Sequence, residues 1–207
     1  MKKFELTSET KINVFGKKLF RIKALISFGD VKAGEAGGWV EKEGNVNQSG
    51  NAWVSGNAEV FGNAWVSGNA WVSGNARVSD NAEVSGNARV SDNAEVFGNA
   101  EVFGNAWVSG NARVSGNARV SDNAEVFGNA RVSDNADYTT IHGFGTQFRT
   151  TTFFRCKDKQ VKVSCGCFYG TIPEFREQVK NTRKGKIAEE YLMIADLMEK
   201  HFAEEAK

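Results

Sequence analysis

The sequence predicts a mainly β protein whose central part is a parallel β-helix, and three observations lead to this prediction. Residues 50–133 form fourteen consecutive six-residue repeats of the pattern Gly/Asp-Asn-Ala-x-Val-Ser/Phe without an insertion. In each repeat Ala and Val are separated by one residue, so both point to the same side of an extended strand. Each strand is followed by Gly-Asn or Asp-Asn, which tolerate positive φ and favour a turn. Such a short, strict repeat indicates a solenoid, whose units bury their apolar side chains by stacking.

The repeat divides the 207-residue chain into three parts. Degenerate copies precede it at 44–49 and follow it at 134–139, so we expect the β-helix to cover residues 44–139. Residues 1–43 are expected to form an N-terminal β-hairpin cap, and residues 140–207 a C-terminal α+β module. Small Ala and β-branched Val suit a narrow, stacked interior. The Asn that recurs at every corner is expected to form an amide ladder with a structural role.

The hexad Val-Ser-Gly-Asn-Ala-x resembles the repeats of the hexapeptide-repeat left-handed β-helices. This resemblance implies a single-stranded, left-handed parallel β-helix with three hexads in each triangular coil. Fourteen hexads then give about five coils and a rod roughly 24 Å long, at ~4.8 Å for each coil.

The variable position x of each hexad points outward, and with three hexads per coil it falls into three columns. The first column is Trp53, Trp71, Arg89, Trp107 and Glu125; the second is Glu59, Arg77, Glu95, Arg113 and Arg131; the third is Trp65, Glu83, Glu101, Arg119 and Asp137. The second column alternates in charge and is expected to form a solvated ladder of weak ion pairs. In the first column we expect a binding face made of Trp53, Trp71, Arg89 and Trp107, with the guanidinium between two indoles. The alternatives are that an end module covers this column, or that the indoles stack on one another.

The segment before the repeat resembles a specific family. Phe20–Ala24, Gly29–Gly34 and the element Gly37-Gly38-Trp39-Val40-Glu41 are similar to the start of hexapeptide-repeat proteins that are common in bacteriophages and prophages. Some bacterial relatives of that family are labelled as acyltransferases. The resemblance covers roughly residues 10–137, and residues 150–169 are similar to the tails of phage-encoded members. A hairpin of residues 11–15 and 19–26 is expected to cover the open end of the first coil.

The C-terminal part reads as two strands, 148–156 and 160–164, followed by two helices. Thr171 and Glu174 have the spacing of a capping box, so the first helix is expected to start there and end at about Asn181. The second helix is expected to follow residue 186 and end at about Phe202. Its apolar stripe is Ile187, Tyr191, Ile194 and Met198. This stripe either packs onto the strands and caps the last coil, or joins subunits in a homo-oligomer.

Residues that could carry chemistry are few. The two histidines, His142 and His201, lie outside the repeat, whereas the enzymes of this fold use a histidine base beside a projecting loop or bind zinc through three histidines. Cys156, Cys165 and Cys167 together with His142 would make four zinc ligands, but Cys-x-Cys alone is a weak signal. We therefore expect no metal, no cofactor and no catalytic residue. An acyltransferase with His142 as its base is the second hypothesis.

Composition limits the partners. The formal net charge of +1 does not favour nucleic-acid binding, and the chain has neither an apolar run of membrane-spanning length nor a secretory signal at residues 1–6. These two absences, together with the odd number of cysteines, favour a cytoplasmic protein. If the gene is a phage gene, the cytoplasm is that of the host bacterium. The leading hypothesis is a non-enzymatic phage or prophage protein that presents its rod to a host or phage protein. Inhibition of a host defence component is one use of such an interaction. A third hypothesis is sequestration of a small ligand such as a nucleotide.

Overall fold

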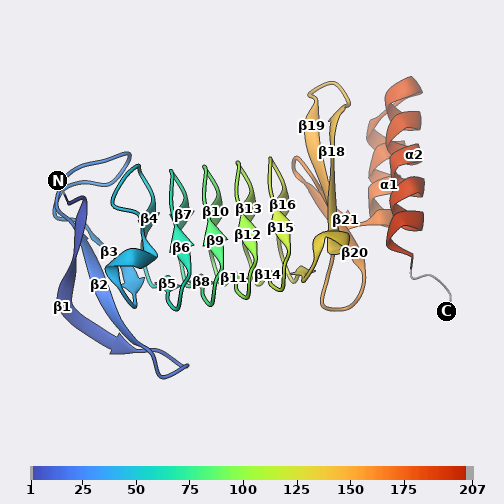
Figure 1. Cartoon of the computed structure of the whole chain (residues 1–207). Coiled ribbons are helices and arrows are strands. Elements are labelled where there is room, and N and C mark those ends of the chain that lie inside the picture. The colour runs from blue at the N-terminus through green and yellow to red at the C-terminus, as the bar shows by residue number, and fades with distance from the viewer. Residues whose placement is uncertain (1, 204–207) are drawn as a thin grey trace.

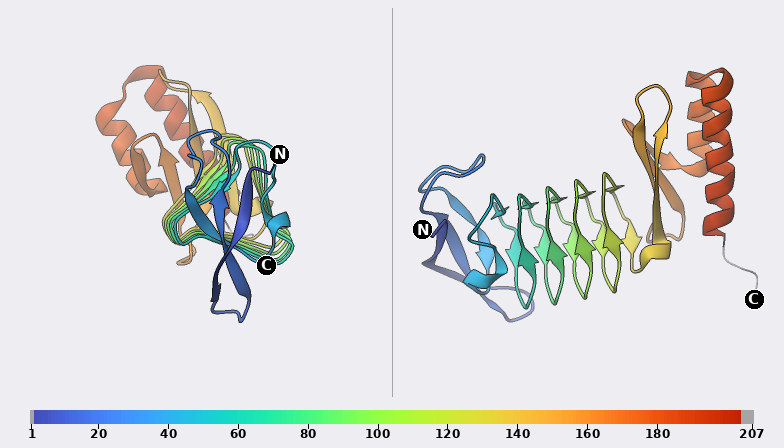
Figure 2. Two further views of the ribbon diagram at one scale, coloured as in Figure 1. Left: turned by 90° about the vertical axis from the view of Figure 1, so that its left-hand side faces the viewer. Right: turned by 45° about the horizontal axis from the view of Figure 1, so that its top comes forward.

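The computed structural model describes residues 2–203 and shows a parallel β-solenoid between two terminal modules (Figure 1). Each hexad contributes one two-residue strand, and each strand pairs in parallel with the strand one coil further along the chain. Trp53, for example, pairs with Trp71, and Arg89 lies between Trp71 and Trp107. The coils superimpose when the rod is viewed along its length (Figure 2). This confirms the predicted solenoid of about five coils.

The strands form three faces that match the three predicted columns, except that Asp137, predicted in the third column, lies in a short 3₁₀ helix, η2 (Asn135–Asp137). The first face consists of β4 (Trp53–Val54), β7 (Trp71–Val72), β10 (Arg89–Val90), β13 (Trp107–Val108) and β16 (Glu125–Val126). The second face consists of β5 (Glu59–Val60), β8 (Arg77–Val78), β11 (Glu95–Val96), β14 (Arg113–Val114) and β17 (Arg131–Val132). The third face consists of β6 (Trp65–Val66), β9 (Glu83–Val84), β12 (Glu101–Val102) and β15 (Arg119–Val120).

The interior of the rod is filled by the two invariant apolar positions of the repeat. Every Ala and Val of the fourteen hexads is at most 1 % exposed, as the alternation of side chains along a strand requires. At each of the three corners the Asn side chains donate to one another along the rod, for example Asn51 to Asn69 at 3.1 Å and Asn69 to Asn87 at 3.0 Å. The amide ladder expected from the sequence is therefore present at all three corners.

The residue before each Asn turns the corner in the left-handed backbone region. Gly occupies most of these positions, and Asp80, Asp92 and Asp122 adopt the same conformation with φ of about 60°. Two of these carboxylates, those of Asp80 and Asp92, accept hydrogen bonds from the next coil, which offset this strain: Asp80 Oδ2 lies 3.0 Å from the backbone nitrogen of Gly98. Asp92 accepts from Gly110 at the same distance. Asp is one of the few residues other than Gly that visits this region readily.

The N-terminal module continues the second face of the rod. β1 (Phe4–Ile12) pairs antiparallel with β2 (Lys18–Ala24), β2 pairs antiparallel with β3 (Ala36–Val40), and β3 pairs in parallel with β5. A short 3₁₀ helix, η1 (Glu43–Asn45), leads into the first coil. The hairpin turn lies at Gly16 as expected, but β1 begins well before residue 11, and β3 adds a third strand. The cap and the rod thus share one eight-stranded sheet.

The C-terminal module is a four-stranded antiparallel sheet covered by two helices. After η2 (Asn135–Asp137), the strands are β18 (Tyr138–Phe144), β19 (Arg149–Arg155), β20 (Val161–Cys165) and β21 (Phe168–Thr171), which pair in chain order. α1 (Ile172–Thr182) and α2 (Gly185–Phe202) follow. Two strands, β19 and β20, match the prediction, whereas β18 and β21 were not expected. The Thr171 side chain caps α1 together with Glu174, as the capping box predicts.

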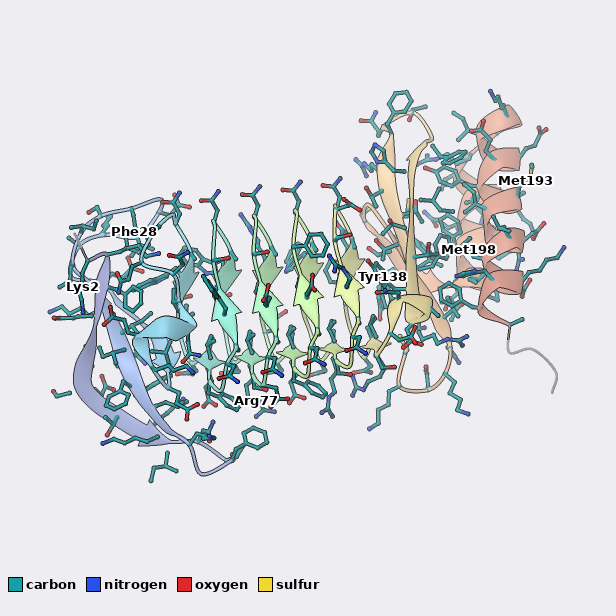
Figure 3. The ribbon with its side chains drawn as sticks, viewed as in Figure 1. Lys2, Phe28, Arg77, Tyr138, Met193 and Met198 are labelled. Carbon is teal, nitrogen blue, oxygen red and sulfur yellow. The ribbon has the colours of Figure 1, made fainter. Side chains whose placement is uncertain are left out.

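This sheet separates the rod from the helices, and β19 contacts both sides. Phe154 packs into the core of the rod, whereas its neighbour Phe153 packs against the helices. Of the predicted apolar stripe, Tyr191, Ile194 and Met198 are buried against the sheet, with Met198 between α2 and the strands (Figure 3). The stripe therefore packs onto the sheet, and the sheet caps the last coil. No helix within residues 2–203 combines the length and apolar character that crossing a membrane requires.

Candidate binding groove

The first face of the rod carries the four residues that the sequence predicts as a binding face, and its N-terminal end is covered. Trp53 has no exposed surface. Its ring makes edge contacts with Phe4, with centroids 6.2 Å apart, and with Phe28 at 5.4 Å. Both phenylalanines belong to the N-terminal module. Trp53 is therefore a core residue, and its assignment to the binding face has to be corrected.

The other three predicted residues line one groove. Trp71, Arg89 and Trp107 come from three successive coils, and the groove between them and the neighbouring corners has a volume of about 640 Å³. Two coil steps of ~4.8 Å separate Trp71 from Trp107, so the groove runs along the rod for about 10 Å. Its full lining is Gly29, Asp30, Asn51, Asn69, Trp71, Ser73, Asn87, Arg89, Ser91 and Trp107.

Trp107 is held in one orientation by contacts on both sides of its ring. Its Nε1 donates to Ser91 Oγ at 3.2 Å, and its ring meets Phe127 edge-on with centroids 5.2 Å apart. The side chain is nevertheless 43 % exposed. A rigid aromatic ring that is half open to solvent needs little ordering when it binds a partner, so less conformational entropy is lost.

Arg89 is exposed at the centre of the groove. Within residues 2–203 it forms no ion pair, and its guanidinium does not stack on Trp71 or Trp107, in contrast to the expectation. Strand register brings the three residues side by side, but Trp107 turns toward Phe127 and Ser91. The positive charge of Arg89 is consequently available to a ligand.

Both ends of the groove are closed by the terminal modules. At one end lie Gly29 and Asp30, from the loop between β2 and β3. Beyond the other end, Glu125 is tied to the C-terminal sheet: its backbone nitrogen donates to Thr152 Oγ1 at 3.0 Å, and its Oε2 accepts from Ser164 at 2.7 Å. The first face is thus open only around Trp71, Arg89 and Trp107.

The other two faces are occupied mainly by charged contacts. On the second face Glu95 bridges Arg77 and Arg113, and Glu59 pairs with Lys11 of the N-terminal hairpin at 2.8 Å. The third face carries a pair between Arg119 and Glu101 at 3.1 Å. Exposed pairs of this kind contribute about 0–1 kcal/mol each. The alternating charges of the second face thus pair in part as predicted. The exception is Glu59, which pairs with Lys11 of the N-terminal hairpin instead of with Arg77.

The residues considered for catalysis or metal binding are not brought together. His142 is exposed on β18, where its Nδ1 lies 3.3 Å from Thr150 Oγ1. Cys156 is buried against the end of the rod, and burial raises the pKa of its thiol to about 11. Cys165 and Cys167 lie at the turn between β20 and β21. Within residues 2–203 no group of three or more His, Cys, Asp or Glu side chains is placed to hold a metal ion.

Sequence reasoning missed the polar lining of the groove. Asn51, Asn69 and Asn87 form the corner on one side, and Ser73 and Ser91 the corner on the other. The same spacing that reveals the columns of x also places these residues beside the first column, so the signal was present in the repeat. The contribution of Asp30 depends on how the loop between β2 and β3 folds back, which the repeat does not encode.

Comparison with protein families finds a similarity within the rod. A family model described as the YdcK beta solenoid repeat matches residues 106–122 and 112–126, which lie in the last coils of the rod. No curated protein matches the chain at a significant level. Over residues 106–126 this chain is therefore similar to the YdcK β-solenoid repeat, in agreement with the parallel solenoid of the structure.

Proposed function

We propose that this chain is a non-enzymatic binding protein that holds a short segment of a partner protein in the groove of the first face. The observation that carries the proposal is that Trp71, Arg89 and Trp107 line one groove of about 640 Å³, with Arg89 and Trp107 exposed and Trp71 partly buried. Trp and Arg are the residue types that contribute most to protein interfaces. A volume of this size lies in the range of ligand-binding sites.

The dimensions of the groove limit what it holds. Its length of about 10 Å equals about three residues of an extended chain at ~3.3 Å per residue. Asn and Ser side chains along its two sides offer donors and acceptors to the backbone of such a segment. Arg89 in the centre favours a segment with an acidic or carbonyl-rich residue at its middle position.

The partner that we propose is a protein of the host bacterium or of the phage, and inhibition of a host defence component is one use of such an interaction. This part of the proposal rests on the resemblance of the segment 10–137 to proteins of bacteriophages and prophages. The location that we propose with it is the bacterial cytoplasm. A rigid rod closed by a module at each end suits a protein that acts by occupying a surface of its partner.

The test is an affinity purification from bacterial lysate with the tagged full chain, in which both proteins and small molecules of the eluate are identified. Wild type is compared with Arg89→Ala/Trp107→Ala. The matched control is Trp65→Ala/Arg119→Ala, which removes the same two residue types from the third face, where Trp65 is 48 % exposed. All replaced side chains are at least partly exposed, so the fold should persist in each variant.

The proposal requires a protein that is captured by wild type and by the control but is lost from the groove variant. If all three bait proteins capture the same partner equally well, the groove is not the site. If the eluate holds a small molecule and no protein, sequestration of a small ligand becomes the better hypothesis.

Two other expectations stay open. An acyltransferase with His142 as its base gains no support from geometry, because the ring contacts a threonine hydroxyl and no carboxylate within residues 2–203 orients it. Homo-oligomerisation through the C-terminal helices remains a prediction. Most of the stripe that suggested it is buried, whereas Met193, on the outer side of α2 (Figure 3), and Leu197 are exposed.

A further inference from the structure

A second cavity lies in the C-terminal module, away from the groove on the rod. It has a volume of about 150 Å³ and lies between the β18–β19 turn, the β20–β21 turn and the two helices. Its floor is apolar and consists of Phe168, Phe175 and Val179. The polar residues around it are Thr146, Gln147, Arg149, Cys165, Cys167, Gln178, Thr182, Arg183 and Tyr191.

The cavity has an uncompensated positive charge. Among residues 2–203, Arg149 and Arg183 are the only charged side chains in its lining, which includes no Asp or Glu. Within residues 2–203 neither arginine has a carboxylate within 4.0 Å, whereas Arg176 of the same module pairs with both Asp196 and Glu199 at 2.7 Å. The two cationic groups are therefore kept apart from the acidic residues that neutralise other arginines of the module.

The positive charges of both guanidinium groups affect Tyr191, which lines the cavity. Burial raises the pKa of the Tyr191 hydroxyl, and the nearby Cys165 adds to this, but Arg183 and Arg149 both act in the opposite direction. The field of the two charges therefore reaches the same hydroxyl, which donates to the carbonyl of Phe144 at 3.2 Å.

Gly166 leaves room for the side chain of Arg149. The backbone at Gly166 has φ +62°, and a Cβ there would collide with Nη1 of Arg149. The guanidinium thus lies close to Gly166 in the β20–β21 turn. The glycine therefore permits one of the two charges to approach this turn, whose residues Cys165 and Cys167 also line the cavity.

We propose that this cavity is an oxyanion site that holds a phosphoryl group between Arg149 and Arg183. Arginine presents its donors in a planar fork that fits phosphate oxygens in a bidentate manner. Hydroxyl and amide groups of Thr146, Gln178 and Thr182 supply further donors for a tetrahedral ligand. A volume of about 150 Å³ is that of a cavity able to hold a molecule as large as benzene, which suits a phosphate or a small phosphomonoester.

The experiment is isothermal titration of the full chain with inorganic phosphate at low ionic strength, where charge interactions are least screened. Phosphoserine and acetate are titrated in parallel. Arg149→Gln, Arg183→Gln and the double variant are compared with Lys184→Gln. This control removes the same charge next to Arg183 from a residue outside the cavity. Because Arg149 and Arg183 are exposed, thermal unfolding should show that every variant is folded.

We expect saturable binding of phosphate with one site per chain, unchanged in Lys184→Gln. Each single arginine variant should bind roughly tenfold or more weakly, the loss expected for one charge-assisted hydrogen bond. Binding of phosphoserine that also depends on Arg149 and Arg183 would identify the ligand as a phosphomonoester, and binding of inorganic phosphate alone would identify free phosphate. The proposal is overturned if wild type shows no saturable binding below about 10 mM phosphate, if acetate binds equally well, or if the double variant binds like wild type.

Discussion

Trp53 and Trp107 occupy the same position of the same repeat but differ in burial, so alanine should destabilise the protein very differently at the two positions. Trp53 has no exposed surface, whereas Trp107 is 43 % exposed. A buried Trp covers on the order of 250 Å², so the two differ by roughly 110 Å² of buried area. At about 25 cal/mol for each Å² this corresponds to about 3 kcal/mol. Trp53→Ala should therefore lower the free energy of unfolding by about 3–5 kcal/mol, and Trp107→Ala by about 1–2 kcal/mol.

The assay is denaturant unfolding of both variants beside wild type, followed by circular dichroism, with the midpoint and the slope of each transition reported. A long repeat protein can unfold in more than one step, so coincidence with a second probe has to be checked first. Equal losses for the two variants would refute the reasoning, because they would mean that Phe4 and Phe28 do not cover Trp53. A larger loss for Trp107→Ala would refute it more strongly.

Three further predictions follow from burial and charge. Val84→Ala should lower the free energy of unfolding by about 2–3 kcal/mol, because it removes two buried methyl groups and leaves a cavity. Glu83→Ala on the same strand should be neutral or stabilising, because Glu83 faces Glu101. Equal effects of the two substitutions in denaturant unfolding would contradict the inward orientation of Val84. Burial lowers the pKa of Lys3 from 10.5 to about 8, so the unfolded state binds more protons there between these values. Wild type should consequently gain stability relative to Lys3→Met as the pH rises from about 8 to about 10.5. If the unfolding free energy of wild type minus that of Lys3→Met did not change over this pH range, the prediction would be wrong. Cys156, with its thiol buried and its pKa raised to about 11, should stay unmodified by a thiol reagent at pH 8 in the folded protein, whereas exposed Cys167 reacts; mass spectrometry of the labelled chain would show a failure directly.

The parts of the fold that depend on local patterns could be predicted from the sequence. The six-residue period places Ala and Val inside, and the multiple of three hexads correctly pairs Trp71 with Arg89 and Arg89 with Trp107. The start of α1 at Thr171 was predictable for the same reason, because a capping box involves only residues close in sequence.

The parts that depend on distant contacts could not be predicted. Trp53 looks like Trp71 and Trp107 in the sequence, and only the return of Phe4 and Phe28 over it makes it a core residue. β18 was not predicted because its residues do not alternate between apolar and polar, and most of its side chains are only partly buried. The cavity at Arg149 and Arg183 is assembled from two turns and two helices, which no periodicity relates.

The identical spacing of the coils fixes how this protein can change in length. Residues 18 apart in the sequence stack directly on one another along the rod. Removing or adding 18 residues would change the distance between the two terminal modules by about 4.8 Å and leave their relative orientation unaltered. Removing a single hexad would instead rotate one terminal module by a third of a turn about the rod axis. Residues that follow the deletion would then stack on a different face of the coils that precede it. Insertions of whole coils therefore change the length of the rod without rotating one terminal module relative to the other. Only such insertions would lengthen the groove while keeping both of its ends closed.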